Sequence, residues 1–401
     1  MFRRRLLGGG LATIGGLAAS GARAADKNYG PGVTDSEIKL GQFAAYSGPL
    51  SAFSVQNKAG LAFFDMVNAE GGVNGRKIKI ISLDDGYVPP KSVEVTRQLV
   101  EQEKVLAFYM PLGTPTNSAV HKYMNQKQVP HLFITSGAVK WGDPKGYPWT
   151  MGWLPSFQAE GGNFTRYVLK TKPDAKIGVL YQNDDFGKDY LRGIQAALGK
   201  QHAKMIVSEQ AYETTDPTID TQIINLKASG ADVLMNIASI KFAAMAIRKM
   251  TDIGWKPMHF LNSPSSGVSA TLAPAGFDNS TGIITADFLK DPTDPRWKDD
   301  KAVADYLAWL KKYQPDANPA DRLNVVGYSI GQTMLQVLKQ CGNDLTRQNV
   351  MKQAANLDIE LPMLLPGIRI KTGPEDFFPI EGEYLQRFDG TRWVVFGDLL
   401  Q

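Results

Sequence analysis

Apolar and polar positions along the chain follow two different periods. Short runs that are rich in apolar and β-branched residues, such as Ile38–Phe43 and Lys176–Tyr181, predict strands. Longer segments with apolar positions three and four residues apart, such as Ala52–Asn68 and Phe157–Thr171, predict helices. The two kinds of segment alternate, and a repeated strand–loop–helix unit predicts parallel sheets that are covered by helices on both faces.

The pattern predicts two cycles of such units, the second of which begins after Trp149. The expected strands cover 38–43, 77–83, 105–110, 131–134, 176–181, 205–209, 232–237 and 258–261. The expected helices cover 52–68, 93–103, 117–125, 157–171, 188–198, 218–229, 241–254, 302–312 and 323–340. Gly382–Phe396 departs from the alternation and predicts antiparallel strands with a turn at Asp389-Gly390.

The N-terminus has the three-part pattern of a secretory signal peptide. Arg3–Arg5 is followed by the uncharged stretch Leu6–Ser20, and Ala22-Arg23-Ala24 places small residues where a signal peptidase cleaves. We expect residues 1–24 to be a signal peptide cleaved after Ala24, on either the Sec or the twin-arginine route. No later window is long and apolar enough to span a bilayer. About 377 residues remain, which is more than one core holds and predicts two domains.

The charge balance argues against a nucleic acid or an anionic membrane surface as partner. The chain has 44 basic and 40 acidic residues, and four of the basic residues are arginines of the expected signal peptide. The mature part is therefore balanced and lacks the basic excess that binds polyanions. The one cysteine, Cys341, excludes internal disulfides and is expected to be a buried structural thiol.

One motif resembles a catalytic site, but its context does not fit. Gly327–Gly331 reads G-x-S-x-G, the pattern of a hydrolase nucleophile elbow, which needs a histidine base later in the chain. The last histidine is His259, so the two glycines are interpreted as positions of close helix packing. The four histidines have no metal-ligand spacing, and no phosphate-binding glycine motif occurs. We expect no catalytic residue, no metal and no cofactor.

Parallel sheets bind ligands in the loops at the carboxyl ends of their strands. These loops are expected at 46–54, 111–117, 135–141, 183–187, 238–241 and 262–266. They are rich in Ser, Thr, Gly and aromatic residues, a composition that suits a carboxylate held by hydroxyl and backbone N–H groups while an apolar body packs beside it.

Six segments carry a resemblance to a known family. They are Ile38–Gly48 (IKLGQFAAYSG), Asn68–Gly75 (NAEGGVNG), Leu112–Ala119 (LGTPTNSA), Tyr181–Asp189 (YQNDDFGKD), Lys227–Val233 (KASGADV) and Ile247–Lys256 (IRKMTDIGWK). In their order and spacing the chain resembles the type I periplasmic binding proteins of the leucine/isoleucine/valine-binding group, which serve ABC importers. The resemblance covers nearly all of the mature chain. It implies a non-catalytic periplasmic protein that captures a small molecule for an inner-membrane permease. The signal pattern and the charge-balanced, cysteine-poor chain predict a monomer.

The family fold consists of two Rossmann-like α/β lobes with parallel sheets, joined by a hinge of three chain crossings. By resemblance the crossings are placed near Trp149–Trp153, Ile284–Phe288 and Leu365–Ile368. Lobe 1 is then expected to comprise 25–151 and 287–365, and lobe 2 to comprise 152–286 and 366–401.

The resemblance also implies a ligand site between the lobes. In the family, a hydroxyl after the third strand and hydroxyl and backbone groups after the fourth hold the ligand carboxylate; here these positions fall on Thr114 and on Ser136–Val139. Phe53 and Phe186 fall on pocket aromatic positions, although both could be ordinary core residues. The complete expected site is Phe53, Leu112, Gly113, Thr114, Thr116, Ser136, Gly137, Val139, Phe186, Ser239 and Asn262.

Departures from the family pattern bear on the ligand. Amino-acid binders of this group offer an acidic residue from lobe 2 to the ligand ammonium, but the matching loop, Asn262–Ser266, has none. Val139 stands at a usual hydroxyl position, and Ser239 or Ile240 stands at a tyrosine position. Together with resemblance to a subgroup that has the run Trp149–Trp153 (WTMGW), this favours an aromatic or other organic carboxylate.

Three alternatives remain open. Asp184 or Asp185 could pair with an ammonium, which would make the chain a binder of branched-chain or other amino acids. A secreted α/β hydrolase is a remote alternative because the histidine base is missing. The sensing domain of a receptor is disfavoured by the absence of a transmembrane or DNA-binding segment in the sequence.

Overall fold

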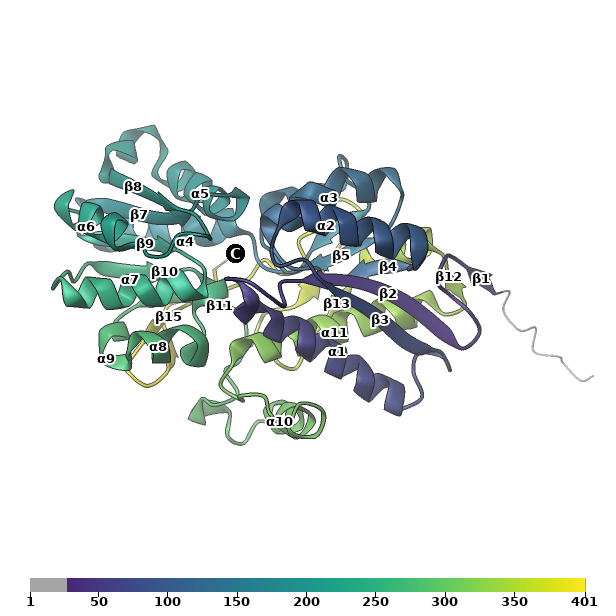
Figure 1. The fold of residues 1–401 in the computed structure, drawn as a ribbon. Helices are drawn as coiled ribbons and strands as arrows, with labels where there is room; N and C mark the ends of the chain where they lie inside the picture. The colour runs from purple at the N-terminus through teal and green to yellow at the C-terminus, as the bar shows by residue number, and fades with distance from the viewer. Residues whose placement is uncertain (1–26, 401) are drawn as a thin grey trace, which may run out of the picture.

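The computed structural model describes residues 27–400, so the expected signal peptide lies outside the described residues. The chain forms two α/β lobes side by side (Figure 1). Each lobe is built on one largely parallel sheet with helices on both faces. This confirms the predicted fold class. Within residues 27–400, no helix combines the length and the apolar character that crossing a membrane requires.

Lobe 1 has a five-stranded parallel sheet in the order β3-β2-β4-β5-β6. Its strands are β2 (Glu37–Ala44), β3 (Lys77–Asp84), β4 (Ala107–Tyr109), β5 (His131–Ile134) and β6 (Thr150–Gly152). Its helices are α1 (Ser54–Ala69), α2 (Pro89–Arg97), α3 (Thr114–Gln126), α10 (Lys301–Tyr313), α11 (Arg322–Cys341) and α12 (Arg347–Ala354). Successive strand residues point to opposite faces, so Tyr109 packs with α1 and α11 whereas Phe108 packs with α2 and α3.

Lobe 2 has a seven-stranded sheet in the order β16-β15-β11-β10-β9-β7-β8. Its parallel strands are β7 (Ile177–Gln182), β8 (Ile206–Tyr212), β9 (Val233–Ile237), β10 (Met258–Leu261) and β11 (Ile284–Asp287), and the antiparallel edge is β15 (Tyr384–Phe388) and β16 (Trp393–Val395). The helices α4 (Phe157–Thr171) and α5 (Asp185–His202) cover the face of Val179, and α6 (Asp220–Ala228) and α7 (Ile240–Asp252) cover the face of Leu180.

The remaining strands and α-helices are short. They are β1 (Asn28–Tyr29), β12 (Asp344–Leu345), β13 (Asp358–Ile359), β14 (Ile370–Lys371), α8 (Ala273–Ala275) and α9 (Phe277–Ser280). β1 pairs with β12 and β13 pairs with β14, so each pair is a separate two-stranded sheet.

Three crossings join the lobes, and one of them lies later than predicted. The first leads from β6 to α4 and the second follows β11, both near the expected residues. The third was expected at 365–368, with 366–401 in lobe 2. Instead Ile370, Phe377 and Ile380 pack in the core of lobe 1, and the chain enters the lobe 2 sheet only at β15. This boundary depends on where apolar side chains become buried, which local sequence does not show.

The G-x-S-x-G segment lies in the middle of α11, and its glycines allow close packing on α1. A Cβ atom at Gly327 would lie 2.1 Å from the backbone oxygen of Gln56, and one at Gly331 would lie 2.5 Å from the ring of Phe63. Ser329 is fully buried in this helix rather than exposed at a strand–helix turn. The packing interpretation is confirmed. Cys341, at the end of α11, is buried as predicted, and burial raises its pKa to about 12.

Candidate functional site

A cavity of about 540 Å³, a volume that includes space open to solvent, lies between the two lobes. Its apolar lining consists of Leu50, Phe53, Leu112, Gly113, Leu154, Phe157, Phe186, Pro264, Leu323 and Val326. Its polar lining consists of Gln56, Tyr87, Thr114, Thr135, Gln182, Ser239 and Arg322. Most of these residues follow the carboxyl ends of strands, which is where parallel sheets place ligands.

Two aromatic rings, Phe157 and Phe186, form part of the wall that lobe 2 contributes. Phe157 begins α4, and its ring meets that of Phe186 edge to face at 5.3 Å between centroids. Tyr190 lies behind both rings, stacked on Phe157 at 4.7 Å and edge-on to Phe186 at 5.5 Å. The three rings hold one another in fixed orientations, so the cavity presents a firm aromatic surface to an apolar ligand.

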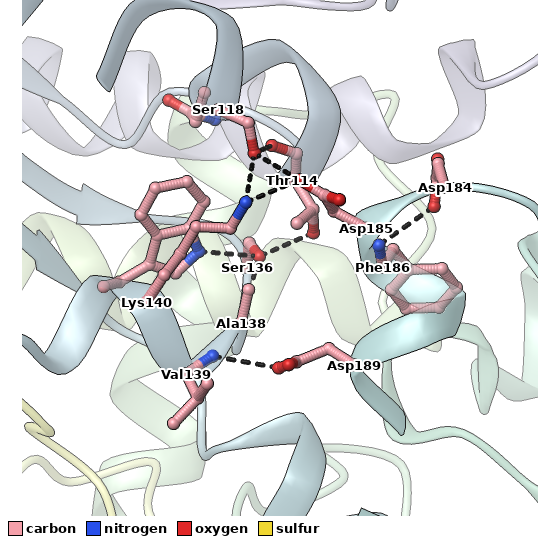
Figure 2. Close-up of polar contacts among 12 residues, drawn as sticks. Thr114, Ser118, Ser136, Ala138, Val139, Lys140, Asp184, Asp185, Phe186 and Asp189 are labelled. Carbon is pink, nitrogen blue, oxygen red and sulfur yellow. Dashed lines mark hydrogen bonds and ion pairs between the residues drawn. The ribbon is translucent and has the colours of Figure 1, made fainter. Parts of the chain in front are cut away.

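The N-terminus of α3 brings a hydroxyl group to the cavity. Gly113 precedes it with a φ of 96°, a conformation that suits glycine, and Thr114 is the first helical residue. The hydroxyl oxygens of Thr114 and Ser136 are 2.7 Å apart (Figure 2). Ser136 Oγ already accepts hydrogen bonds from the backbone N–H of Ala138 and from Nε1 of Trp141, so its own proton is directed to Thr114. The Thr114 proton is thereby left as a donor for a ligand.

Hydrogen bonds to residues outside the cavity wall hold the polar groups of lobe 2 in place. The hydroxyl of Tyr212 donates to Gln182 Oε1 at 3.1 Å and accepts from the backbone N–H of Ser239 at 2.8 Å. Gln182 Nε2 donates to Asp184, which also caps α5 by accepting from the N–H groups of Phe186 and Gly187. Burial raises the pKa of Asp184 to about 6. Its carboxylate is thus engaged with α5 and does not line the cavity.

Arg322 is the one charged side chain among the described residues that line the cavity. It is the first residue of α11 in lobe 1, and its guanidinium binds both carboxylate oxygens of Asp287, the last residue of β11. The two side chains are 13% and 8% exposed. Burial opposes the charge of Arg322, but the Asp287 carboxylate outweighs that effect and raises the pKa of the guanidinium.

A separate set of contacts joins the lobes beside the cavity (Figure 2). Lys140 of lobe 1 binds Asp185 of α5 at 2.5 Å and the hydroxyl of Ser118 at 2.7 Å, and Ser118 also donates to Asp185. The backbone N–H of Val139 donates to Asp189 of α5 at 2.9 Å. The described structure is therefore a closed arrangement in which protein atoms of the two lobes bind directly to each other.

Asp185→Asn is expected to shift the ligand-free protein toward an open form. Lys140 and Asp185 are 36% and 42% exposed, and an exposed pair contributes about 0.2–1 kcal/mol, so the open-to-closed ratio should rise by up to about fivefold. Distances between spin labels on the two lobes would measure the shift. Asp220→Asn is the matched control, because Asp220 also begins a helix and pairs with a lysine, Lys249, but within lobe 2. An unchanged distance distribution for Asp185→Asn would contradict the expectation.

The structure places six of the eleven predicted site residues on the cavity wall. These are Phe53, Leu112, Gly113, Thr114, Phe186 and Ser239. The other five, Thr116, Ser136, Gly137, Val139 and Asn262, do not line the cavity. The Thr116 hydroxyl donates to the backbone oxygen of Leu112, and Asn262 Nδ2 donates to that of Ala238 at 2.7 Å. Both side chains stabilise the loops rather than face the ligand space.

Residues of the segment after β5 do not line the cavity but bind residues that do. Ser136 orients the hydroxyl of Thr114, as described above. The carbonyl of Gly137 accepts from the backbone N–H of Phe157 at 2.8 Å, which joins this loop to α4. The side chain of Val139 is 39% exposed, and its backbone binds Asp189 of the other lobe. Val139 was predicted to contact the ligand, but in the described arrangement its side chain does not line the cavity.

Several lining residues were not predicted, among them Tyr87, Gln182 and Arg322. Gln182 ends β7 immediately before a loop that was singled out, so an extension of one residue would have included it. Tyr87 follows β3 with a φ of 62°, and burial raises its pKa well above the usual value. The residues around Arg322 do not indicate a ligand site, because Arg322 begins a helix and does not lie in a loop after a strand. It reaches the cavity only after the chain has returned from lobe 2 and formed α11.

Comparisons with known proteins agree with this architecture. The periplasmic binding protein family model matches residues 37–392. The Leu/Ile/Val-binding protein homolog 7 of Brucella abortus (strain 2308) is 21% identical over 321 residues, which are 78% of this chain and 79% of that protein. A branched-chain amino acid ABC transporter protein from Thermus thermophilus, solved with bound valine, has a TM-score of 0.82 at 16% identity. The match covers 92% of this chain and 97% of that chain.

A fatty acid ABC transporter substrate-binding protein from Thermomonospora curvata has a TM-score of 0.75 at 21% identity, with 93% of this chain and 94% of that chain covered. At these identities the two solved structures establish the fold alone. The family model, in contrast, spans most of the chain, including the loops that build the cavity. This chain therefore belongs to the periplasmic binding protein family.

Proposed function

We propose that this protein is the periplasmic, non-catalytic solute-binding component of an ABC importer and that it captures a small organic carboxylate, preferably an aromatic acid. One observation carries the ligand class: no Asp or Glu within residues 27–400 lines the cavity, whose wall is mainly apolar and aromatic. An α-ammonium group bound there would be desolvated without a counter-charge, which costs several kcal/mol. The carboxylate of an apolar acid is desolvated as well, but the wall offers it hydroxyl and N–H donors in place of water.

The donors on the wall support the carboxylate. Thr114 has a hydroxyl proton free to donate, and it lies at a helix N-terminus, where backbone N–H groups favour an anion. The two solved neighbours are named for valine and for fatty acids, and both kinds of ligand carry a carboxylate. Only valine carries an ammonium as well. A monomer that delivers such an acid to an inner-membrane permease fits the family.

Amino-acid binding is the second candidate, and the names of the relatives favour it. The two acids that could pair with an ammonium are already engaged: Asp184 caps α5, and Asp185 binds Lys140. Neither lines the cavity in the described arrangement. The hydrolase alternative has even less support, because Ser329 is buried within α11.

Isothermal titration calorimetry tests the ligand class. The probes are benzoate, 4-hydroxybenzoate, 3-phenylpropionate and decanoate, compared with L-leucine and L-valine. We expect at least one of the acids to bind and neither amino acid to bind. Submicromolar binding of L-leucine would refute the proposal and would identify Asp184 or Asp185 as the ammonium partner after rearrangement.

Thr114→Ala is expected to weaken binding of the acid by about 10- to 150-fold. The physical reason is the loss of one hydrogen bond to a charged group, which contributes about 1.5–3 kcal/mol. Thr114→Ser keeps the hydroxyl and is the matched control, with an expected dissociation constant near that of the wild type. An unchanged dissociation constant for Thr114→Ala in the same titration would show that the anion binds elsewhere.

A further inference from the structure

The ion pair between Arg322 and Asp287 lies at the junction of the two lobes, and its arginine lines the cavity. Nε and Nη2 of Arg322 are 2.5 and 2.6 Å from the two oxygens of Asp287, in the paired geometry that a guanidinium and a carboxylate prefer. Asp287 also accepts from the backbone N–H groups of Phe288 and Leu289 at 2.7 and 3.1 Å. The carboxylate is therefore held by the backbone, and it in turn fixes the arginine.

The guanidinium retains unused donors. An arginine has five N–H groups, and the bonds to Asp287 use one on Nε and one on Nη2. Nη1 has no hydrogen bond to any atom of residues 27–400, although the side chain is largely removed from water. Nη1 is not fully buried, and Arg322 lines the cavity, so the free N–H groups are open to an acceptor that a ligand supplies.

We propose that Arg322 binds the acidic group of the ligand and that Asp287 orients it for this contact. This inference rests on the proposed function and adds to it a specificity-determining residue. Arg322 belongs to lobe 1 and Asp287 ends a strand of lobe 2, so an anion bound here contacts a group that is held by both lobes. The pair is neutral overall, so the site selects acids by the free N–H groups of Arg322, which are donors only and offer an ammonium no acceptor.

The test separates ligand binding from a purely structural ion pair by giving the two substitutions opposite expected effects. Asp287→Asn removes the charge that neutralises Arg322 but keeps a side-chain oxygen that can accept from the guanidinium and hold it in place, so 3-phenylpropionate should bind as tightly as to the wild type or more tightly. Arg322→Gln combined with Asp287→Asn removes both charges, and the same acid should bind about 10- to 150-fold more weakly. Arg322→Gln alone is avoided, because it leaves a buried carboxylate without its cation.

The matched probe is 3-phenylpropanamide, which has the same body and no charge. Its dissociation constant should be similar for all three proteins, since the change concerns only the acidic group. If the pair is merely structural, both variants weaken the acid and the amide alike, and the inference is overturned. Should the double variant fail to fold by circular dichroism, Asp287→Asn alone decides, because a loss of acid affinity in it also overturns the inference.

The two proposals fail in distinguishable ways. If the wild type binds none of the four acids of the titration panel, the proposed ligand class and the role of Arg322 both fail. If the wild type binds an acid and the double variant binds it equally well, only the role of Arg322 fails. That acid then replaces 3-phenylpropionate as the probe, with its own amide as the uncharged control.

Discussion

Replacing Trp153 by alanine is expected to lower the free energy of unfolding by about 3–5 kcal/mol, the usual loss for a fully buried large aromatic side chain. Trp153 is completely buried in the core of lobe 1. Its ring lies edge-on to Phe288 at 5.7 Å between centroids, and its Nε1 donates to Thr333 Oγ1 at 3.0 Å. The side chain thus connects the first crossing, the second crossing and α11.

Chemical denaturation followed by circular dichroism measures this loss. Trp153→Phe is the matched control, because it keeps an aromatic ring in the core and removes the indole N–H. Thr333 Oγ1 also donates to the backbone oxygen of Ser329, so it keeps a partner in the control variant. The control should therefore lose much less stability than the alanine variant. A loss below about 1 kcal/mol for Trp153→Ala would contradict the packing argument.

Elements that are short apolar runs or have a helical repeat could be predicted from the sequence almost to the residue. The strands His131–Ile134 and Met258–Leu261 and the helix Phe157–Thr171 have the predicted bounds. β6 (sequence TMG) and β11 (sequence ITAD) mix apolar residues with polar and small ones, so neither forms a clear apolar run. They are strands because neighbouring strands pair with them, which is a tertiary effect.

The site, too, has features that the sequence predicts and features that depend on tertiary contacts. The topology of parallel sheets predicts which loops border the cavity, and Thr114 and Phe186 lie there as expected. Which side chain of a loop faces the ligand depends on local hydrogen bonds. Thr116, two residues after Thr114, donates its hydroxyl proton to the backbone oxygen of Leu112 instead. Arg322 reaches the wall only because α11 packs on α1, a contact between segments that lie far apart in the sequence.

Two buried carboxyl groups in lobe 2 are expected to make stability depend on pH. Glu160 of α4 accepts hydrogen bonds from the backbone N–H and the hydroxyl of Ser263 at 2.8 and 2.6 Å. Glu383, just before β15, accepts from Asn163 at 2.5 Å. The two side chains are 1% and 2% exposed. Burial raises the pKa of Glu160 to about 7, and burial together with repulsion from Glu160 raises that of Glu383 well above its usual value.

The sign follows from proton binding. Both pKa values are higher in the folded protein than in the unfolded chain, where a glutamate titrates near pH 4.3. Between that pH and the folded pKa values, the folded state holds more protons, so stability falls as pH rises. The loss is about 1.4 kcal/mol per pH unit for each such proton. The contribution is fully present below about pH 4.3 and is lost as pH rises through the folded pKa values.

Other charged groups around the pair modify this contribution but do not reverse it. Arg322 lowers the pKa of Glu160, Arg166 lowers that of Glu383, and Asp287 raises that of Glu383. Elsewhere, His131 and His259 have lowered pKa values because they are buried. They take up protons mainly in the unfolded chain, so they destabilise the protein below about pH 6.5. The wild-type profile mixes these opposing effects.

Glu383→Gln isolates the carboxyl pair, because the variant and the wild type share every other titrating group. The free energy of unfolding of the variant, minus that of the wild type, is expected to increase by about 1.4 kcal/mol per pH unit between pH 5 and the folded pKa of Glu383. Glu375→Gln is the control, because Glu375 is 75% exposed and pairs with Lys145 at the surface. Its free energy of unfolding, minus that of the wild type, should be nearly the same at each pH. Urea unfolding at pH 5, 6, 7 and 8 measures both differences. A difference for Glu383→Gln that does not change with pH would mean that Glu383 ionises as freely in the folded protein as in the unfolded chain, and the buried pair would then hold no proton near neutral pH.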